Sequence, residues 1–226
     1  MMEIQPVAHI RSDFKEKFGI PRQSGLVETL RAAVIFTPEY RVFEAVRGLE
    51  DFSHIWLIWE FSQARRETWS PTVRPPRLGG NKRVGVFASR SPFRPNGLGL
   101  SCVRLVGIDY GDKDSPVLLV AGADLLDGTP VYDVKPYIPY ADAHPEASGG
   151  FTSQIARKTL QVRCPEELLG KLPAEKRDAL LGVLAEDPRP SYQDDPERVY
   201  GMAFGQWEVR FRVEGDQLTV TGIEVK

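Results

Sequence analysis

The stretch LSCVRLVGIDYGDKDSPVLLVAGA, residues 100–123, indicates the architecture of the first part of this chain. Two runs of β-branched and aliphatic residues, 100–108 and 117–123, flank a connection of Gly, Asp, Ser and Pro. Apolar runs of this length between turn-forming residues are typical of strands. The stretch therefore predicts two short strands separated by a turn-rich connection.

Similar apolar runs occur at four earlier places: residues 4–10, 26–36, 55–61 and 84–88. Repeated short strands interrupted by Gly, Pro and Asp fit a barrel or a sandwich better than alternating β and α units. One short helix is expected at Tyr40–Arg47, because a Thr-Pro pair precedes it and a Gly follows it. We therefore predict a mainly β chain of the α+β class.

A linker is predicted in the second half of the chain. Residues 141–154 are poor in large apolar side chains and rich in small or turn-forming residues. We expect the chain to divide near residue 145, with a mainly β domain at 1–145 and a small α/β domain at 146–226. A length of 226 residues suits one medium and one small domain.

The predicted C-terminal domain contains a helix and a hairpin. Residues 173–187 have apolar side chains at helical spacing, and Pro188 ends the pattern. Residues 207–213 alternate between apolar and charged side chains. Gly215-Asp216 supplies a turn, and Leu218 begins the return strand. These patterns predict a small α/β unit.

Composition excludes several classes of protein. No apolar run reaches the roughly 18 residues needed to cross a bilayer, and the N-terminus lacks a secretory signal, so a cytoplasmic location without membrane contact is expected. Cys102 and Cys164 lie far apart without a metal-ligand pattern, which favours two reduced thiols. No pair among His9, His54 and His144 has metal-binding spacing, so we expect no metal.

The net charge of -2 conceals a local excess of positive charge. Residues 65–104 contain nine Lys and Arg residues but only one acidic residue, Glu67, so the rest of the chain is acidic. A focused basic segment favours local attraction of a polyanion such as RNA. Pairing of these arginines with acids elsewhere in the fold is an equally weighted alternative.

The segment KRVGVFASRSPFRPNGLGLSCVR, residues 82–104, predicts a rigid ligand cradle. Pro92 and Pro95 each fix φ and remove a backbone donor. Arg90 and Arg94 present planar, always-charged groups that suit phosphate, carboxylate or stacked bases. A connection that holds one shape and carries two such groups indicates a binding site.

The segment DLLDGTPVYDVKPYIPY, residues 124–140, combines acids, a lysine and three tyrosines. Asp133 and Lys135 are separated by one residue, so both point to the same side of an extended segment. An ion pair between them is the structural alternative to a functional role, because charged neighbours commonly neutralise each other.

Three segments resemble the TsaA-like family, also called TrmO: VRPPRLGGNKR, GVFASRSPFRPNGLGLS and LLDGTPVYDVKPYIPYAD. The resemblance extends over nearly the whole chain through KEKFGIPRQSGLV, AVRGLEDFSHIWLIWEFSQ and LAEDPRPSY. It implies an S-adenosylmethionine-dependent tRNA methyltransferase that methylates N6 of threonylcarbamoyladenosine, the modified base next to the anticodon. It also implies a β-barrel-like, non-Rossmann domain that binds the methyl donor, a small α/β C-terminal domain and a homodimer.

The resemblance further implies the position of the S-adenosylmethionine site. Related members often carry His where this chain has Ser62, so a backbone contact is expected there rather than a side-chain role. The implied donor-binding residues are Gln23, Ser24, Gly25, Ser62, Gln63, Arg90, Leu100, Asp124, Leu125, Leu126, Asp127 and Gly128.

The implied reaction needs a proton acceptor and in-line alignment, but no metal. The carbamoyl group on N6 makes its proton more acidic and its lone pair less nucleophilic, so proton removal should accompany methyl transfer. Asp133 is the candidate base, and Lys135 is expected to orient it or to hold the substrate carboxylate. A tyrosinate is an alternative, with Tyr137 as the candidate.

Contacts with tRNA are expected from the basic residues. Residues 187–192, Asp-Pro-Arg-Pro-Ser-Tyr, form a second rigid turn with an exposed arginine that either touches the anticodon loop or caps the preceding helix. The candidate tRNA-binding residues are Arg74, Arg77, Lys82, Arg83, Arg94 and Arg189.

Two other functions fit the same residues. One is a non-catalytic RNA- or nucleotide-binding module that uses the cradle without transferring a methyl group. The other is a methyltransferase that acts on a different acceptor. The joint presence of the cradle and the 124–140 segment favours the enzyme.

Overall fold

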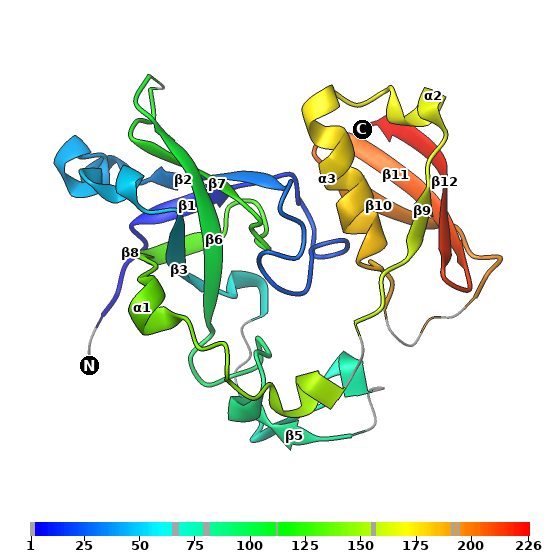
Figure 1. Cartoon of the computed structure of the whole chain (residues 1–226), viewed down its shortest axis with the longest axis horizontal. Coiled ribbons are helices and arrows are strands. Elements are labelled where there is room, and N and C mark those ends of the chain that lie inside the picture. Colours follow the sequence, from blue (N-terminus) through cyan, green and yellow to red (C-terminus); the bar gives the residue numbers. More distant parts are fainter. Residues whose placement is uncertain are drawn as a thin grey trace.

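The computed structural model describes residues 3–64, 68–78, 82–111, 113–154, 157–190, 193 and 195–226. Two β units and a small separate two-stranded sheet make up this part of the chain (Figure 1). The first is a closed six-stranded barrel, and the second is a four-stranded sheet covered by a helix. The mainly β prediction is confirmed, whereas the domain boundary at residue 145 stays a prediction.

The barrel is antiparallel throughout, with the strand order β1-β2-β7-β6-β3-β8. The predicted strands of residues 100–123 are β6 and β7, which pair with each other. The barrel closes where β1 pairs with β8. The strands are β1 (Ala8–Arg11), β2 (Arg31–Phe36), β3 (His54–Glu60), β6 (Leu98–Asp109), β7 (Val117–Ala121) and β8 (Pro130–Pro136).

Alternation of side chains fills the barrel interior. Along β3, Ile55, Leu57 and Trp59 are buried, while Trp56 and Ile58 between them are half-buried on the outer face. A period of two is what a pleated strand imposes, so each strand contributes every second side chain to the core. The outer face of β3 is nevertheless apolar at these two positions.

The helix expected at Tyr40–Arg47 is wrong. Three short 3₁₀ segments occupy this region: η1 (Pro38–Tyr40), η2 (Phe43–Val46) and η3 (Leu49–Asp51). Val42 is extended, with φ -119° and ψ 118°, which interrupts any continuous helix. The β-branched side chain of Val42 disfavours a helix. The Thr-Pro start and the Gly stop are therefore accompanied only by short 3₁₀ segments and not by one continuous helix.

Smaller elements connect the barrel strands to each other and to the second unit. The strand expected at 84–88 is only partly present, because β5 (Val84–Gly85) turns directly into η6 (Val86–Ala88). The remaining short elements are η4 (Ser62–Ala64), β4 (Thr72–Val73), η5 (Pro76–Leu78), α1 (Pro139–Asp142) and η7 (Gly150–Gln154).

The C-terminal unit contains the predicted helix and hairpin. Its sheet has the order β10-β11-β12-β9, and only β9 runs parallel to its neighbour. Four apolar side chains of α3 are buried against it, as the helical spacing predicted. The elements are β9 (Gln161–Arg163), α2 (Glu166–Leu169), α3 (Ala174–Ala185), β10 (Tyr200–Phe204), β11 (Trp207–Glu214) and β12 (Gln217–Val225).

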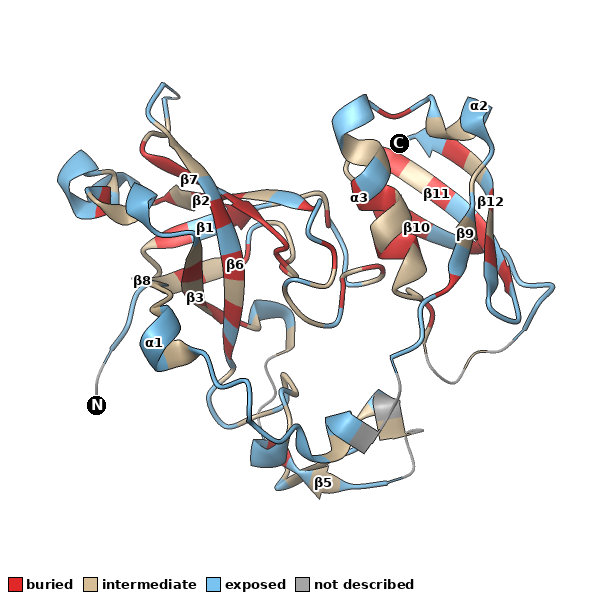
Figure 2. Ribbon diagram, in the orientation of Figure 1, coloured by how far each residue is buried: buried red, intermediate tan, exposed pale blue. Residues whose placement is uncertain are grey.

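The connection between β1 and β2, residues 12–30, belongs structurally to both units. It leaves the barrel and runs toward α3 (Figure 1), and Figure 2 colours parts of it as buried. Its buried side chains Phe14, Val27 and Leu30 are part of the C-terminal core. The ring of Phe14 meets that of Phe204 edge-on, with centroids 6.1 Å apart. The C-terminal core is therefore completed by residues from the N-terminal part of the chain.

Candidate active site

A hydrogen-bonded chain surrounds Asp124 at one end of the barrel. The indole N–H of Trp59 donates to Ser101 Oγ at 3.0 Å, and Ser101 Oγ donates to Asp124 Oδ1 at 2.7 Å. Burial raises the pKa of Asp124, while hydrogen bonds from Ser101 and the Ser24 backbone and the charge of Arg90 oppose this shift. A partly buried carboxylate held by several donors is a group poised to bind a ligand.

The turn of Gln23, Ser24 and Gly25 packs against this carboxylate. Arg90 Nη1 donates to Gln23 Oε1 at 2.5 Å, and the Gly25 N–H donates to the Gly122 carbonyl at 2.8 Å. A Cβ added to Gly122 would lie 3.2 Å from Gly25 Cα, and Gly122 has φ +77°. The close approach of the two backbones therefore requires glycine at position 122. Together with the Arg90–Gln23 hydrogen bond, it brings the 23–25 turn, the cradle and the segment before Asp124 together.

The DLLDG turn is fixed by the β1–β2 connection. Asp127 accepts hydrogen bonds from the Ser12 N–H at 2.9 Å and from Lys15 Nζ at 2.5 Å. Leu125 is buried in the barrel core, and Leu126 packs against the C-terminal core. The side chains of these two leucines are thus structural, and their carbonyls accept from the Ser12 and Thr129 hydroxyls at 2.8 and 2.7 Å.

The other implied donor-binding residues lie around the same end of the barrel. Ser62 and Gln63 begin η4 directly after β3, and the Gln63 carbonyl accepts from Lys17 Nζ at 2.7 Å. Gly128 makes a turn with φ +76°. Leu100 is 53% exposed on the outer face of β6. The role of each in donor binding stays a prediction.

Asp133 and Lys135 form the ion pair that was the structural alternative for them. Lys135 Nζ lies 2.9 Å from Asp133 Oδ2, and both side chains are partly exposed. Across the sheet, Asp133 is opposite Ile58, and Ile58 is opposite Leu100. The candidate base therefore lies two strands from Leu100 on the outer barrel face, a separation of about 10 Å. The ion pair does not test the catalytic role of Asp133, which stays a prediction.

Tyr137 is surrounded by aromatic rings. Its ring centroid lies 5.8 Å from that of Trp56 and 6.1 Å from that of His54, and its N–H donates to the His54 carbonyl. Trp56 in turn donates its indole N–H to Asp142, the last residue of α1. Packing accounts for the position of Tyr137, and its participation in catalysis stays a prediction.

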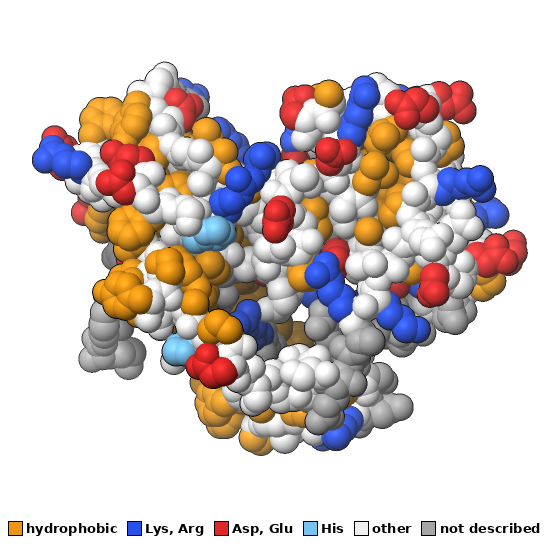
Figure 3. Space-filling view, viewed as in Figure 1, with side chains coloured by type: hydrophobic (Ala, Val, Ile, Leu, Met, Phe, Trp, Pro, Cys, Tyr) orange, Lys and Arg blue, Asp and Glu red, His pale blue; other side chains and the backbone are white. Residues whose placement is uncertain are grey.

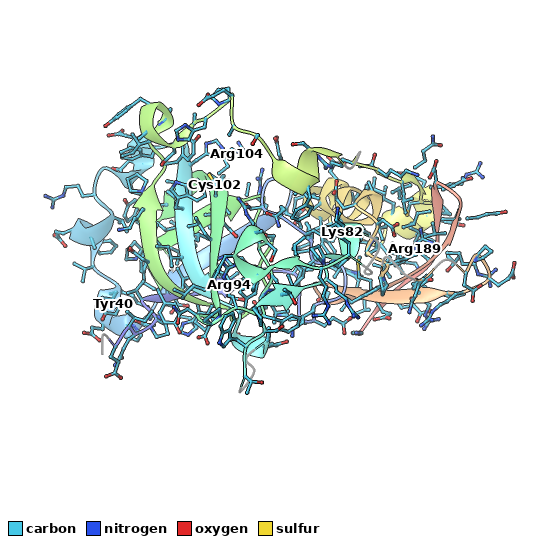
Figure 4. The ribbon with its side chains drawn as sticks, turned by 90° about the horizontal axis from the view of Figure 1, so that it is seen from below. Tyr40, Lys82, Arg94, Cys102, Arg104 and Arg189 are labelled. Carbon is cyan, nitrogen blue, oxygen red and sulfur yellow. The ribbon has the colours of Figure 1, made fainter. Side chains whose placement is uncertain are left out.

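The candidate tRNA-binding residues differ in how far their side chains are exposed to solvent. Arg74, Lys82 and Arg83 are exposed around β4 and β5, and Arg83 Nη1 donates to Thr72 Oγ1. Figure 4 shows Lys82 toward the C-terminal unit, Arg94 nearer the middle of the barrel unit, and Tyr40 at the opposite end. Basic side chains also line the recess between the two units (Figure 3). The side chain of Arg77 lies outside the described residues.

The expectation of an exposed arginine in the 187–192 turn is wrong. The Arg189 side chain is only 9% exposed, and its Nε and Nη2 donate to both carboxylate oxygens of Asp187 at 2.9 and 3.1 Å. Asp187 follows α3 and has φ +52°, a left-handed conformation in which the helix cannot continue. The arginine stabilises this turn, which favours the capping alternative. Ser191 and Tyr192 lie outside the described residues.

Sequence reasoning missed several residues that organise the site. Trp59 is a core residue, but its indole N–H also supports Ser101, and an inward-facing serine on an apolar strand was the available signal. Lys15 and Lys17 lie in the motif KEKFGIPRQSGLV, and no individual role was predicted for them, although each fixes a segment of the site. No local pattern indicates which segment a surface lysine will reach.

Two features of the described residues bear on membrane contact and metal binding. No helix in this part of the chain has the length and apolar character needed to cross a membrane. Within the described ranges, no cluster of three or more His, Cys, Asp or Glu side chains is arranged to hold a metal ion.

Comparison with known proteins gives concordant results. Family models for the tRNA-methyltransferase O N-terminal domain and the TrmO C-terminal domain match residues 9–143 and 157–226. A relative from Escherichia coli K12, named tRNA (adenine(37)-N6)-methyltransferase, is 42% identical over 98% of this chain and 97% of its own length. A Pseudomonas aeruginosa relative, named putative S-adenosylmethionine-dependent methyltransferase RcsF, is 42% identical over 92% of this chain and 91% of its own length. A crystal structure of TrmO from Pseudomonas aeruginosa matches with a TM-score of 0.80 and 34% identity, covering 99% of each chain.

Proposed function

The chain belongs to the TrmO family, and from this membership we propose that it methylates N6 of the adenosine at position 37 of tRNA with S-adenosylmethionine as the donor. The acceptor is threonylcarbamoyladenosine, and the enzyme acts in the cytoplasm. The observation that carries the proposal is the convergence of Gln23, Ser24, Arg90 and Asp124 at one end of the barrel.

These residues fit the chemistry of the donor. When bound, S-adenosylmethionine supplies an electrophilic methyl group on a positively charged sulfur. Asp124 offers a carboxylate to its hydroxyl or ammonium groups, and Arg90 offers a guanidinium to its carboxylate. The close approach of Gly25 and Gly122 holds the Gln23–Gly25 turn against the segment that leads to Asp124. A site built from fixed donors and acceptors aligns the reacting groups without further reorganisation.

Asp133 is the proposed proton acceptor for N6. Its carboxylate is on the same outer face as Leu100, and Lys135 at 2.9 Å holds it in one orientation. Proton removal restores the nucleophilicity that the carbamoyl group withdraws from N6. Tyr137 packs next to the same strand and is the second candidate for this step.

The basic surface is proposed to bind the anticodon arm. Exposed Arg74, Lys82 and Arg83 suit phosphate oxygens, and Arg94 suits either a phosphate or the threonyl carboxylate. Arg77 belongs to the same proposal by its sequence position. Arg189 does not, because its guanidinium is occupied by Asp187.

We also propose that the protein acts as a homodimer through the outer face of β3 and β6. Trp56 is opposite Cys102 and Ile58 is opposite Leu100, so apolar side chains form adjacent rows on this face. Figure 3 shows hydrophobic side chains grouped over this part of the barrel unit. An exposed apolar sheet face of this kind is well suited to a self-complementary contact.

Labelled S-adenosylmethionine and purified tRNA test the proposed function. The protein is incubated with tRNA from cells that make threonylcarbamoyladenosine and from cells that do not, and the nucleosides are analysed by mass spectrometry. Product only from the modified tRNA supports the proposal. Product from both tRNAs indicates a different acceptor, and tight binding of donor and tRNA without product indicates the non-catalytic module.

A further inference from the structure

A hollow of about 430 Å³ opens beside the implied donor site. Its walls come from three segments: the end of β3 with η4, the segment before β4, and the rigid loop of the cradle. The lining residues are Glu60, Phe61, Ala64, Thr68, Trp69, Ser70, Pro92, Phe93, Arg94, Pro95 and Gly97.

Three of the lining residues are aromatic, and two of these are exposed. Trp69 is 54% exposed and Phe93 is 36% exposed. Phe61 is half-buried and packs its ring against Trp59, with centroids 4.3 Å apart. Exposed Trp and Phe rings around one hollow are not needed for the core, so they indicate a surface that a flat ligand covers.

The cradle loop connects this hollow to the donor site. Arg90 reaches Gln23, whereas Arg94 lines the hollow and donates from Nη1 to the Ser89 carbonyl at 3.0 Å. The two arginines therefore serve different sites from one rigid segment. A planar cation fixed at the edge of an aromatic hollow suits a ligand that carries both a ring and a negative charge.

A second connection joins the hollow to the donor site through β3. Ser62 and Gln63 of the implied donor site lie in sequence between Phe61 and Ala64, which both line the hollow. The ring of Phe61 also contacts Trp59, the first member of the hydrogen-bonded chain that ends at Asp124. A chain of contacts through Phe61, Trp59 and Ser101 thus links a group in the hollow to Asp124.

We propose that this hollow binds the acceptor purine of tRNA, turned out of the anticodon loop, with its ring stacked on Trp69 and Phe93. Arg94 pairs with the carboxylate of the threonylcarbamoyl group. Enzymes that modify a base withdraw it from its stack, and aromatic side chains replace the lost stacking. The proposal rests on the proposed function and adds where the acceptor base binds.

The first test compares Trp69→Ala with Trp69→Phe in methylation of an anticodon stem-loop that carries threonylcarbamoyladenosine. Trp69→Ala should lower kcat/KM by about 10- to 100-fold, the usual effect of losing one stacking partner. Trp69→Phe should recover most of the activity. S-adenosylmethionine affinity, measured by calorimetry without RNA, should equal that of the wild type in both variants.

Phe43→Ala is the matched control, because Phe43 is an exposed aromatic outside the hollow whose ring contacts Tyr110 at 5.7 Å. It should keep wild-type activity. Unchanged kcat/KM in Trp69→Ala overturns the proposal, and so does an equal loss of donor affinity, which would assign Trp69 to the donor site. If Trp69→Ala does not fold by near-ultraviolet circular dichroism, Phe93→Leu replaces it with the same expectations.

Arg94→Met tests recognition of the acceptor's negative charge. It should raise KM for the threonylcarbamoyl stem-loop more than it weakens binding of an otherwise identical stem-loop with plain adenosine. Equal weakening of both RNAs would assign Arg94 to the phosphate backbone and overturn its part in the hollow.

A binding measurement separates this proposal from the proposed function. Stem-loops with 2-aminopurine at the acceptor position report base stacking by fluorescence quenching, and no methyl transfer is needed. The complex with Trp69→Ala should be brighter than the wild-type complex, because a stacking partner is lost. Equal emission from the two complexes overturns binding of the acceptor base in the hollow, even if the wild type methylates tRNA. A brighter Trp69→Ala complex combined with an inactive wild type rejects only the proposed catalytic function.

Discussion

Lys176 of α3 forms a salt bridge with Asp13 of the β1–β2 connection, and its Nζ lies 2.6 Å from both carboxylate oxygens. Both side chains are largely shielded from solvent. The Asp13 carbonyl also accepts from the Gly205 N–H at 2.7 Å, and Glu16 accepts from the Ala203 N–H at 3.2 Å. These contacts fix the first part of a connection whose middle carries the Gln23–Gly25 turn.

The Gln23–Gly25 turn is thus anchored to the C-terminal unit on both sides. Gly19, with φ +93°, lies directly against Met202 before the turn, and Val27 lies against Gly182 after it. Donor binding at the turn and the contact between the two units are therefore expected to be coupled, and coupling of this kind is reciprocal.

Lys176→Met should weaken this anchor. We expect a loss of about 1 kcal/mol in the free energy of unfolding, since the pair is partly solvated, together with a several-fold weaker S-adenosylmethionine affinity. Urea denaturation and calorimetry measure the two effects. Lys176→Arg should restore donor affinity, which a nonspecific loss of packing would not allow.

Arg210→Met is the control for that experiment, because the Arg210–Glu224 pair at 3.2 Å is exposed and belongs to the same C-terminal sheet. Its removal should change stability by less than about 0.5 kcal/mol and leave donor affinity alone. Equal donor affinity in Lys176→Met and the wild type would show that the two units are not coupled through this contact.

Gly99→Ala should damage the donor site through packing. A Cβ at this position would lie 2.3 Å from a ring carbon of Trp59, whose indole N–H supports Ser101 and Asp124. We expect a loss of about 1–3 kcal/mol in unfolding free energy, as for other overpacked sites, and a weaker donor affinity. Gly107→Ala on the same strand has open space around it, so it should leave both properties near wild type.

Asp124 should make stability depend on pH. Burial raises its folded-state pKa above the ordinary value of 3.8, so the folded protein binds this proton more tightly than the unfolded chain. The associated stability is therefore present at pH values below 3.8 and is lost as the pH rises through the folded-state pKa. Denaturation at several pH values should show this decline in the wild type and not in Asp124→Asn.

Ser101→Ala tests the same dependence of stability on pH through the hydrogen-bond donor of Asp124. Ser101 donates to Asp124 and favours its charged form, so its removal should move the decline in stability to higher pH. A decline at the same pH in both proteins would mean that another group causes it.

Local pattern predicted the strands of residues 100–123 and the helix at 173–187, because side-chain period directly reflects which face is buried. It did not predict that Phe14 and Leu30 complete the C-terminal core, since contacts between distant segments leave no periodic signal. Burial of Arg189 was missed for a similar reason: Asp187 occurs two residues earlier, but only the turn geometry makes a bidentate pair. For the donor site, the individual residues came from family resemblance, and the supporting roles of Lys15 and Ser101 required coordinates.

Asp133 provides the sharpest test of the proposed chemistry. If its carboxylate accepts the N6 proton, Asp133→Asn should lower kcat by about 100-fold or more, with unchanged affinity for donor and tRNA. Lys135→Met should have a smaller effect on kcat, because it removes the partner at 2.9 Å but leaves the base in place. If instead the pair only stabilises the outer face of β8, the two substitutions should cost similar stability and neither should reduce single-turnover rates at saturating substrates. Retention of the wild-type rate by Asp133→Asn would transfer the role to Tyr137, for which Tyr137→Phe is the corresponding variant.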